Sequence, residues 1–221
     1  MVEIRRSVKY PEANDSYRIG QRPKVRVSIV DYGVGNLHSI RKALEIAGAR
    51  PVIESNVRNL LDAEVMVFPG VGAFDPAAKK LEPYREIILD RLNAGTPCLG
   101  VCIGTHILFE GSAEGTLPGI GFLQGKVEKL QTEKVPHIGW NQVKSEDAYL
   151  NGVESPYFYF AHSYRGKPTE DVVRGTTEYY EVFPSLIRKK NTVAVQFHPE
   201  KSGASGAIFL KNFIKFVEEK L

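Results

Sequence analysis

The hydrophobic and polar positions of the chain follow one pattern up to about residue 111 and another pattern after it. The first pattern alternates short apolar runs with amphipathic segments. The apolar runs predict strands at residues 25–32, 51–55, 64–68 and 97–101. Because strands and helices alternate, this part favours a parallel sheet with helices on both faces.

Three helices are predicted in this first part. Residues 36–49 have amphipathic helical spacing with a glycine near the end, and residues 75–94 also have helical spacing. Pro83 lies inside the second segment and should break or kink it, because proline cannot continue the hydrogen-bond pattern of a helix. Residues 102–111 predict a short helix directly after the strand at 97–101.

From residue 119 the chain is rich in alternating or β-branched runs separated by turn residues. The residues 207–220 then predict a final amphipathic helix. The predicted fold class is therefore α/β, with a central, mostly parallel sheet flanked by helices and additional antiparallel strands in the second half. The strands predicted in this half are residues 121–130, 135–143, 157–164, 172–179, 183–189 and 192–197.

Residues 1–24 show neither helical nor strand periodicity, and they are predicted to form an arm outside the core. Residues 25–221 are interpreted as one domain. Hydrophobic residues make up 43% and charged residues 25% of the chain, as in ordinary soluble proteins. The net charge of +3 is too small to imply a nucleic-acid partner. Neither an apolar run long enough to span a bilayer nor a signal-peptide pattern is found, which predicts a cytoplasmic protein with no membrane partner.

The two cysteines, Cys98 and Cys102, indicate thiol chemistry. They cannot form a disulfide framework, and they lack the second pair expected of a zinc site, so no metal or cofactor is predicted. The sequence GVCIG at 100–104 is the cysteine form of the nucleophile elbow, in which glycines permit a sharp turn and close packing. A helix N-terminus would favour the thiolate of Cys102. The alternative is a buried cysteine among small residues.

A nucleophile needs a base, and His198 stands out among the five histidines because it is followed by Pro199 and Glu200. In extended geometry residues i and i+2 share a face, so Glu200 is expected to reach and orient the ring. Cys102, His198 and Glu200 would then form a catalytic triad. The alternative for His198 alone is a hydrogen-bonded histidine at the end of a strand.

The glycine-rich turn FPGVGAF at 68–74 is the candidate oxyanion hole. Gly70 and Gly72 can expose backbone N–H groups at the same edge of the sheet as the cysteine. The candidate donor pair is the N–H of Val71 with the N–H of Ile103. A phosphate site is the alternative, but the turn lacks the Lys and Ser/Thr of a P-loop.

The motifs PGVGAF, GVCIG and HPEKS, in this order, resemble those of the class I, triad-type glutamine amidotransferases. The segments DYGVGN, VPHIGWNQV, YFYFAHSY and GTTEY further resemble the glutaminase subunits of imidazole glycerol phosphate synthases. This resemblance implies hydrolysis of glutamine to glutamate and ammonia through a glutamyl thioester. It also implies a (β/α)8 barrel cyclase as partner, which uses the ammonia in histidine biosynthesis to make imidazole glycerol phosphate and an aminoimidazole carboxamide ribotide.

The resemblance assigns roles to further residues. Glu114 and the segment His162, Ser163 and Tyr164 match positions that contact the substrate glutamine. Positions that face the cyclase are matched by Asn36, Trp140, Tyr159 and Lys201. Each of these four has an ordinary structural alternative: a helix cap for Asn36, core packing for the two aromatic residues, and a solvated charge for Lys201.

The chain departs from the family at Thr105 and His106, where Met and Gln are usual. His106 lies one helical turn after Cys102 and faces the same way. Two roles are open for His106. It can donate to the substrate the hydrogen bond that the usual Gln side chain makes, or it can shift the pKa of the Cys102 thiol.

Three rival hypotheses remain. The first, an amidotransferase of another pathway, is disfavoured by PHIGWN and YFYFAHSY. The second, an α/β-hydrolase or cysteine peptidase, is disfavoured because the acid follows the histidine by two residues, whereas α/β-hydrolases place it before the histidine. The third is a docking subunit with an inactive site, which a glutaminase assay would distinguish.

Overall fold

The computed structural model describes residues 24–33, 37–70 and 72–221. All of the predicted arm except Lys24 lies outside the described residues, as do the candidate residues Asn36 and Val71. The division into an arm and one domain therefore stays a prediction. None of the helices in the described part has the length and hydropathy needed to cross a bilayer.

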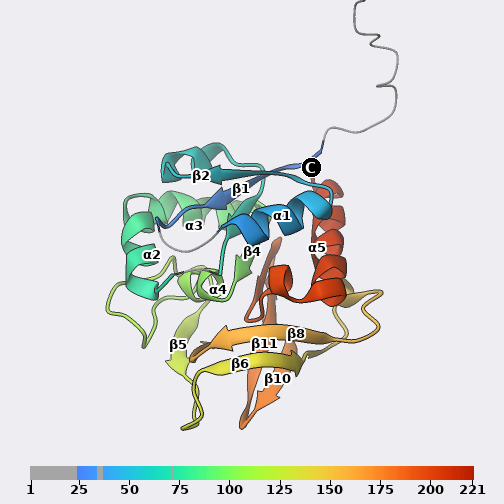
Figure 1. The fold of residues 1–221 in the computed structure, drawn as a ribbon. Coiled ribbons are helices and arrows are strands. Elements are labelled where there is room, and N and C mark those ends of the chain that lie inside the picture. Colours follow the sequence, from blue (N-terminus) through green and yellow to red (C-terminus); the bar gives the residue numbers. More distant parts are fainter. Residues whose placement is uncertain (1–23, 34–36, 71) are drawn as a thin grey trace, which may run out of the picture.

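An eight-stranded mixed sheet runs through the molecule (Figure 1), in the order β2-β1-β3-β4-β12-β11-β10-β7. The first five strands in this order are parallel to one another, and the last three continue the sheet in antiparallel fashion. This confirms the predicted fold class. The strands are β1 (Arg26–Val30), β2 (Arg50–Glu54), β3 (Met66–Phe68), β4 (Cys98–Val101), β7 (Lys144–Ser145), β10 (Val173–Tyr179), β11 (Glu181–Lys189) and β12 (Thr192–Val195).

Helices cover both faces of the parallel strands, because the strands inside the sheet are buried on both sides. Val27 and Ile29 of β1 pack in one core cluster with helices α1 (His38–Ile46) and α5 (Gly203–Glu218), which lie side by side in Figure 1. Val30 of the same strand packs in a second cluster with the helices of the opposite face. These are α2 (Phe74–Leu81), α3 (Arg85–Ala94) and α4 (Ile103–Ile107).

Short 3₁₀ helices connect several elements. One of them, η3 (Glu82–Tyr84), contains Pro83 and separates α2 from α3, so the predicted break occurs where the proline stands. The others are η2 (Val57–Asp62), η4 (Ala148–Leu150) and η5 (Pro199–Lys201).

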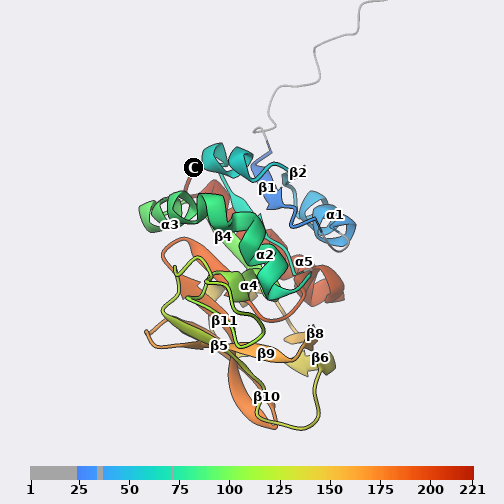
Figure 2. The same ribbon diagram turned by 90° about the vertical axis from the view of Figure 1, so that its left-hand side faces the viewer.

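Two small antiparallel ribbons lie beyond the parallel strands, in the lower part of Figures 1 and 2. One pairs β5 (Gly125–Lys129) with β9 (Tyr164–Pro168), and the other pairs β6 (His137–Gln142) with β8 (Tyr157–His162). The run at 157–164, predicted as one strand, is therefore two strands that divide at Ser163. Strands β7 and β9 were not predicted.

Candidate active site

Cys102 lies at the turn from β4 into α4, at the carboxyl end of a central parallel strand. Its φ of 46° is in the left-handed region, where a residue with a side chain is strained. The backbone N–H of Cys102 donates to the carbonyl of Val195 at 2.8 Å, which fixes the turn against β12. The cysteine thus stands at a strained strand-to-helix turn, as the elbow motif predicts.

The glycines of the elbow permit close packing. A Cβ atom at Gly104 would lie 1.9 Å from the carbonyl oxygen of Phe68, and one at Gly100 would lie 3.1 Å from the carbonyl oxygen of Gly104. Contacts below 3.0 Å are essentially never made by a real Cβ, so position 104 requires glycine. The sharp turn itself is made by Cys102 and not by either glycine.

His198 and Glu200 form the expected pair: the Nδ1 of His198 lies 2.8 Å from the Oε1 of Glu200, and both side chains are buried. The extended geometry predicted for this contact is wrong, because residues Pro199–Lys201 form the 3₁₀ helix η5. His198 precedes that helix in an extended conformation, and the tight turn brings the carboxylate back to the ring. Within the described part, the second oxygen of Glu200 has no hydrogen-bond partner.

The imidazole of His198 lies close enough to the thiol of Cys102 to interact with its charge. Burial lowers the pKa of His198, but the charge and hydrogen bonding of Cys102 and of Glu200 raise it more, to about 10. At neutral pH this raised pKa favours the charged form of the imidazole. A charged imidazole in this position can stabilise a negative charge on the sulfur and can protonate a leaving group.

A pocket of about 200 Å³ opens beside the thiol. Its walls come from the elbow, from the glycine-rich turn, from the loop after α4 and from the ends of β6, β8 and β9. It brings together all five residues predicted to contact the substrate with the candidate nucleophile Cys102. The lining residues are Gly72, Cys102, Ile103, His106, Glu114, Pro136, Ala161, His162, Ser163 and Tyr164.

Glu114 is half-buried at the N-terminus of α2. Burial raises its pKa, a hydrogen bond from the backbone of Phe74 lowers it, and the charge of Asp75 raises it further, so that the net change is upward. Asp75 holds the loop after α4 in place by accepting hydrogen bonds from the backbone N–H groups of Thr116 at 2.9 Å and Leu117 at 3.1 Å. A carboxylate is thereby fixed at the mouth of the pocket, where it could bind an ammonium group.

A chain of neutral histidines supports the opposite wall. The Nδ1 of His162 donates to the carbonyl of Tyr164 at 2.8 Å, and its Nε2 lies 3.1 Å from the Nδ1 of His137. Burial lowers the pKa of His162 to about 3 and that of His137 to about 4. His137 is stacked between the rings of Phe160 and Tyr179, with centroids at 4.9 and 4.0 Å. These contacts hold the strand end that carries Ala161, whose carbonyl is 3.9 Å from the sulfur of Cys102.

The predicted oxyanion hole is described only in part. Ile103 begins α4 directly after the nucleophile, where the first N–H groups of a helix have no acceptor within the helix. Gly70 packs against His198, and a Cβ there would lie 2.7 Å from the Cε1 of the ring. Gly72, with φ of 96°, lines the pocket. Because Val71 lies outside the described residues, the pairing of its N–H with that of Ile103 stays a prediction.

The candidates for the partner interface lie on the surface near the triad. Trp140 and Tyr159 are paired across β6 and β8, with ring centroids 6.2 Å apart, and Trp140 is 57% exposed. Lys201 is exposed and lies in η5, next to Glu200. Ile138 and Tyr157, which the sequence analysis missed, are also exposed and share this face. We call Ile138, Trp140, Tyr157 and Tyr159 the β6–β8 face.

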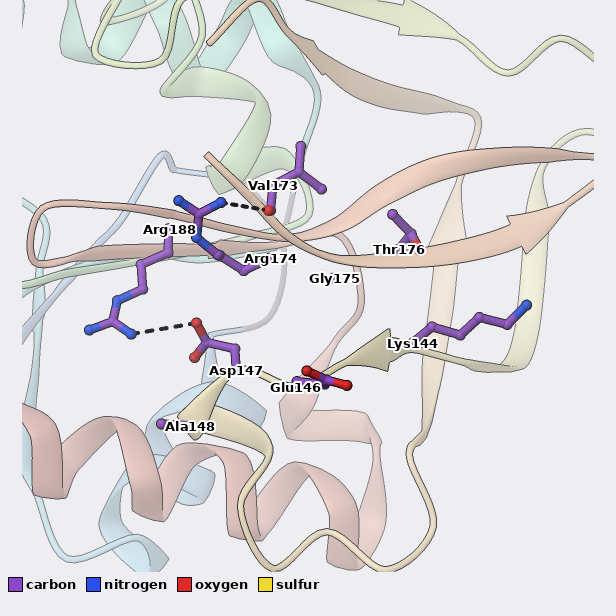
Figure 3. A pocket seen from close by; sticks show the side chains of 9 residues that line it. All are labelled: Lys144, Glu146, Asp147, Ala148, Val173, Arg174, Gly175, Thr176 and Arg188. Atoms are coloured by element: carbon purple, nitrogen blue, oxygen red, sulfur yellow. Dashed lines mark hydrogen bonds and ion pairs between the residues drawn. The ribbon is translucent and has the colours of Figure 1, made fainter. Parts of the chain in front are cut away.

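A larger hollow of about 620 Å³ lies elsewhere, between β7, β10 and β11 (Figure 3). Its two arginines are engaged with neighbours: the guanidinium of Arg188 lies 3.4 Å from Asp147, and Arg174 donates to the carbonyl of Val173 at 2.8 Å. No cysteine or histidine lines it. The smaller pocket at the elbow, by contrast, is lined by Cys102, His106 and His162.

Comparison with known proteins defines the class. Residues 28–216 match the model of the class I glutamine amidotransferase family, and the chain belongs to this family. Solved structures agree with this at the level of the fold. PurLQS from Thermotoga maritima is 21% identical with a TM-score of 0.67, covering 90% of this chain and 99% of that one. A glutamine amidotransferase from the same organism is 16% identical with a TM-score of 0.61, covering 90% and 86%.

Within the family, the chain belongs with the HisH subunits of imidazole glycerol phosphate synthase. The subunit from Thermococcus kodakarensis is 46% identical over 196 residues, covering 85% of this chain and 98% of that one. Those from Trichormus variabilis and Methanocaldococcus jannaschii are each 42% identical, covering 88% and 86% of this chain and 98% and 100% of theirs. The resemblance inferred from the motifs is confirmed.

Proposed function

We propose that the chain hydrolyses glutamine with Cys102 as nucleophile, His198 as acid and base, and Glu200 as the residue that orients His198. The observation that carries this proposal is the buried pair of His198 and Glu200 beside the thiol of Cys102. That thiol belongs to a strained turn and lines a pocket. The HisH relatives support glutamine as the substrate and histidine biosynthesis as the pathway.

The mechanism follows from the positions of these groups. The sulfur of Cys102 attacks the side-chain amide carbon of glutamine, and N–H donors stabilise the negative charge that develops on the amide oxygen. His198 gives its proton to the leaving nitrogen, so that ammonia departs and a glutamyl thioester remains. His198 then accepts a proton from water as the water attacks the thioester, which releases glutamate and restores the thiolate.

We further propose that the ammonia passes to a partner cyclase, of (β/α)8 barrel fold, which binds over the β6–β8 face. Support comes from the exposure of Ile138 at 63% and Trp140 at 57%, because large apolar side chains gathered on one exposed face are typical of interaction sites. This face also contacts the triad: the carbonyl of Tyr159 accepts from the N–H of His198 at 2.8 Å. Lys201, and Asn36 outside the described residues, are proposed to lie at the same interface.

The direct test is glutamate release by the purified chain, alone and with the cyclase subunit of an imidazole glycerol phosphate synthase loaded with its substrate. We expect low activity alone and strong activation in the complex, since docking at the β6–β8 face can bias the position of His198. No release even with the loaded partner would leave only a docking subunit with an inactive site. The cytoplasmic location expected from the sequence stays a prediction.

The interface has its own test. Trp140→Ala should weaken binding to the cyclase by about 2 kcal/mol, as the truncation of a central aromatic residue typically does. Val182→Ala is the matched control, because Val182 is 64% exposed and lies on β11, outside this face. Equal affinity of the two variants in a titration of the cyclase would place the interface elsewhere.

A further inference from the structure

Two buried side chains beside the nucleophile take no part in the mechanism described above. The Nε2 of His106 lies 2.9 Å from the Oε1 of Gln196, and the Nε2 of Gln196 lies 3.7 Å from the sulfur of Cys102. The two side chains are 3% and 2% exposed. They form a chain of hydrogen bonds that starts on α4 and ends at the reacting atom. Gln196 was not among the residues predicted from the sequence.

The direction of these bonds follows from the chemistry of the groups. Burial lowers the pKa of His106 to about 4, so the neutral ring carries one N–H at pH 7. The amide oxygen of Gln196 can only accept, and therefore Nε2 of His106 donates to it. The Nδ1 of His106 is then a lone pair, buried without a partner in the described part of the chain.

The reversed amide would be less favourable. It would place the oxygen of Gln196 against the sulfur and make the Nε2 of His106 an acceptor. The one proton of the ring would then sit on Nδ1, leaving a buried N–H without an acceptor. Orphaned buried N–H groups are rarer in folded proteins than acceptors that lack a partner. The geometry thus favours an amide N–H that points at the sulfur.

We propose that Gln196 is a further catalytic residue, which donates a hydrogen bond to the thiolate of Cys102, and that His106 is the positioning residue that fixes the amide in this orientation. The inference rests on the proposed function, in which Cys102 is the nucleophile. A donor aimed at the sulfur stabilises the anion relative to the thiol, because a hydrogen bond to a charged group is stronger than one to a neutral group.

The backbone around Gln196 holds this donor in place. The N–H of Gln196 donates to the carbonyl of Ser185 at 3.0 Å. The carbonyl of Val195, one residue earlier, accepts from the hydroxyl of Thr105 at 2.7 Å and from the N–H of Cys102. Thr105 and His106, the two residues that depart from the usual Met and Gln, therefore both bind the end of β12. Of the two roles left open for His106, this favours an effect on the thiol, exerted through Gln196.

The experiment measures the alkylation of Cys102 by iodoacetamide as a function of pH, using the full chain and locating the product by peptide mapping. Gln196→Leu should move the midpoint of the profile up by about one pH unit and slow the reaction at pH 6 about tenfold. His106→Leu should shift the midpoint in the same direction. His106→Gln retains an amide N–H that can bond to Gln196, and it should restore the profile of the parent chain.

The matched control is Thr192→Val, which removes a buried hydroxyl from the same strand but next to Cys98. It should leave the profile unchanged. If Gln196→Leu does not fold, Gln196→Met keeps the length of the side chain, removes the N–H donor and should raise the midpoint by a similar amount. An unchanged midpoint of the alkylation profile in the folded variant overturns the proposal. A lowered midpoint also overturns it, because it would show that the amide oxygen of Gln196, and not its N–H, faces the sulfur. Because alkylation needs no glutamine, a chain without glutaminase activity but with these shifts would contradict only the proposed function.

Discussion

The two ends of strand β4 carry the same residue type in opposite chemical environments. Cys98, at the start of the strand, is fully buried among apolar side chains, and burial raises the pKa of its thiol well above the ordinary value. Cys102 follows the last residue of the strand, where a strained turn, the imidazole of His198 and the amide of Gln196 surround the sulfur. Only three residues separate a thiol in an apolar core from the proposed nucleophile.

The difference shows that position in the sheet, and not the residue type, determines the environment of each thiol. At the carboxyl edge, each parallel strand leads into a loop or helix that can turn a side chain toward a shared site. β3 leads into the glycine-rich turn, β4 into the elbow, and β12 into the segment that carries Gln196, His198 and Glu200. At the opposite edge, Cys98 pairs in register with Met66 and Thr192, inside the regular sheet.

Replacing each cysteine in turn is the sharpest test of this contrast, and it has the largest expected effect. Cys102→Ala should lower glutamine hydrolysis by roughly 10⁴-fold or more, because no other group can form the thioester. Ammonia-dependent synthesis by the partner cyclase should remain. Cys98→Ala should retain the activity, with a loss of about 1 kcal/mol in the free energy of unfolding from the lost packing.

Steady-state rates with glutamine and with ammonium salts, together with urea unfolding, measure both halves of the comparison. If both variants keep glutamine-dependent synthesis, Cys102 is not the nucleophile. If Cys98→Ala folds normally but loses activity, the view of this thiol as inert is wrong.

The sequence predicted the parallel half of the fold well, since β1, β3 and β4 are short, buried apolar runs that alternate with amphipathic segments. The antiparallel half was predicted less completely. The run at 157–164 is uniformly β-forming, and only the tertiary pairing of its two parts with different partners divides it at Ser163. β7 has two residues, too few for any periodicity.

The candidate triad could be proposed from the sequence because Cys102 lies between glycines after an apolar run, and His198 ends another apolar run and is followed by Pro199 and Glu200. The contact between His198 and Glu200 was correct for the wrong reason, because a proline after the histidine starts a 3₁₀ turn there. Gln196 could not be found, since a glutamine near a strand end has many possible roles in the sequence. Its role depends on the side chain of His106, which is 90 residues away in the chain.

The second prediction concerns His198, the proposed acid and base beside Cys102. Glu200→Gln removes the negative charge that helps to keep His198 protonated and oriented, and it should lower the rate of glutamine hydrolysis about 10²- to 10³-fold. The pKa of His198, which Cys102 and Glu200 together raise to about 10 against the effect of burial, should fall when the contribution of Glu200 is removed. NMR titration of the His198 ring measures that shift directly. Lys201→Gln in the free chain is the neighbouring control, because it changes a charge in the same 3₁₀ helix but leaves the pair intact; equal rates in the two variants would contradict the orienting role of Glu200.

The third prediction concerns the turn that separates the two environments. Gly104→Ala would force a methyl group against the carbonyl of Phe68, and overpacking against rigid backbone should cost about 3 kcal/mol in the free energy of unfolding. Gly111→Ala is the matched control, because a Cβ there meets nothing within 4 Å. Urea unfolding of the two variants measures the difference. A variant at position 104 as stable as the one at position 111 would show that α4 can move away from β3 at little cost.

The smallest expected effect is the pH dependence of stability, which comes from buried histidines near the carboxyl edge of the sheet. His106, His137 and His162 have lowered pKa values, because burial disfavours their charged forms, so the unfolded chain binds more protons than the native chain as the pH falls below 6.5. Their contribution to stability is present above pH 6.5 and is lost as the pH falls toward 4. His198 acts in the opposite sense: its pKa is raised, so its contribution is present below pH 6.5 and is lost as the pH rises through 10.

The three histidines with lowered pKa values outweigh the one histidine with a raised pKa. A fall from pH 7.5 to 5.5 should therefore reduce the free energy of unfolding by about 1–2 kcal/mol. Urea unfolding at the two pH values tests this, in a range that lies above the titration of ordinary carboxylates. A chain that is more stable at pH 5.5 would mean that the histidines of this edge are charged in the native state, and that the wall of the pocket is wetter than its packing indicates.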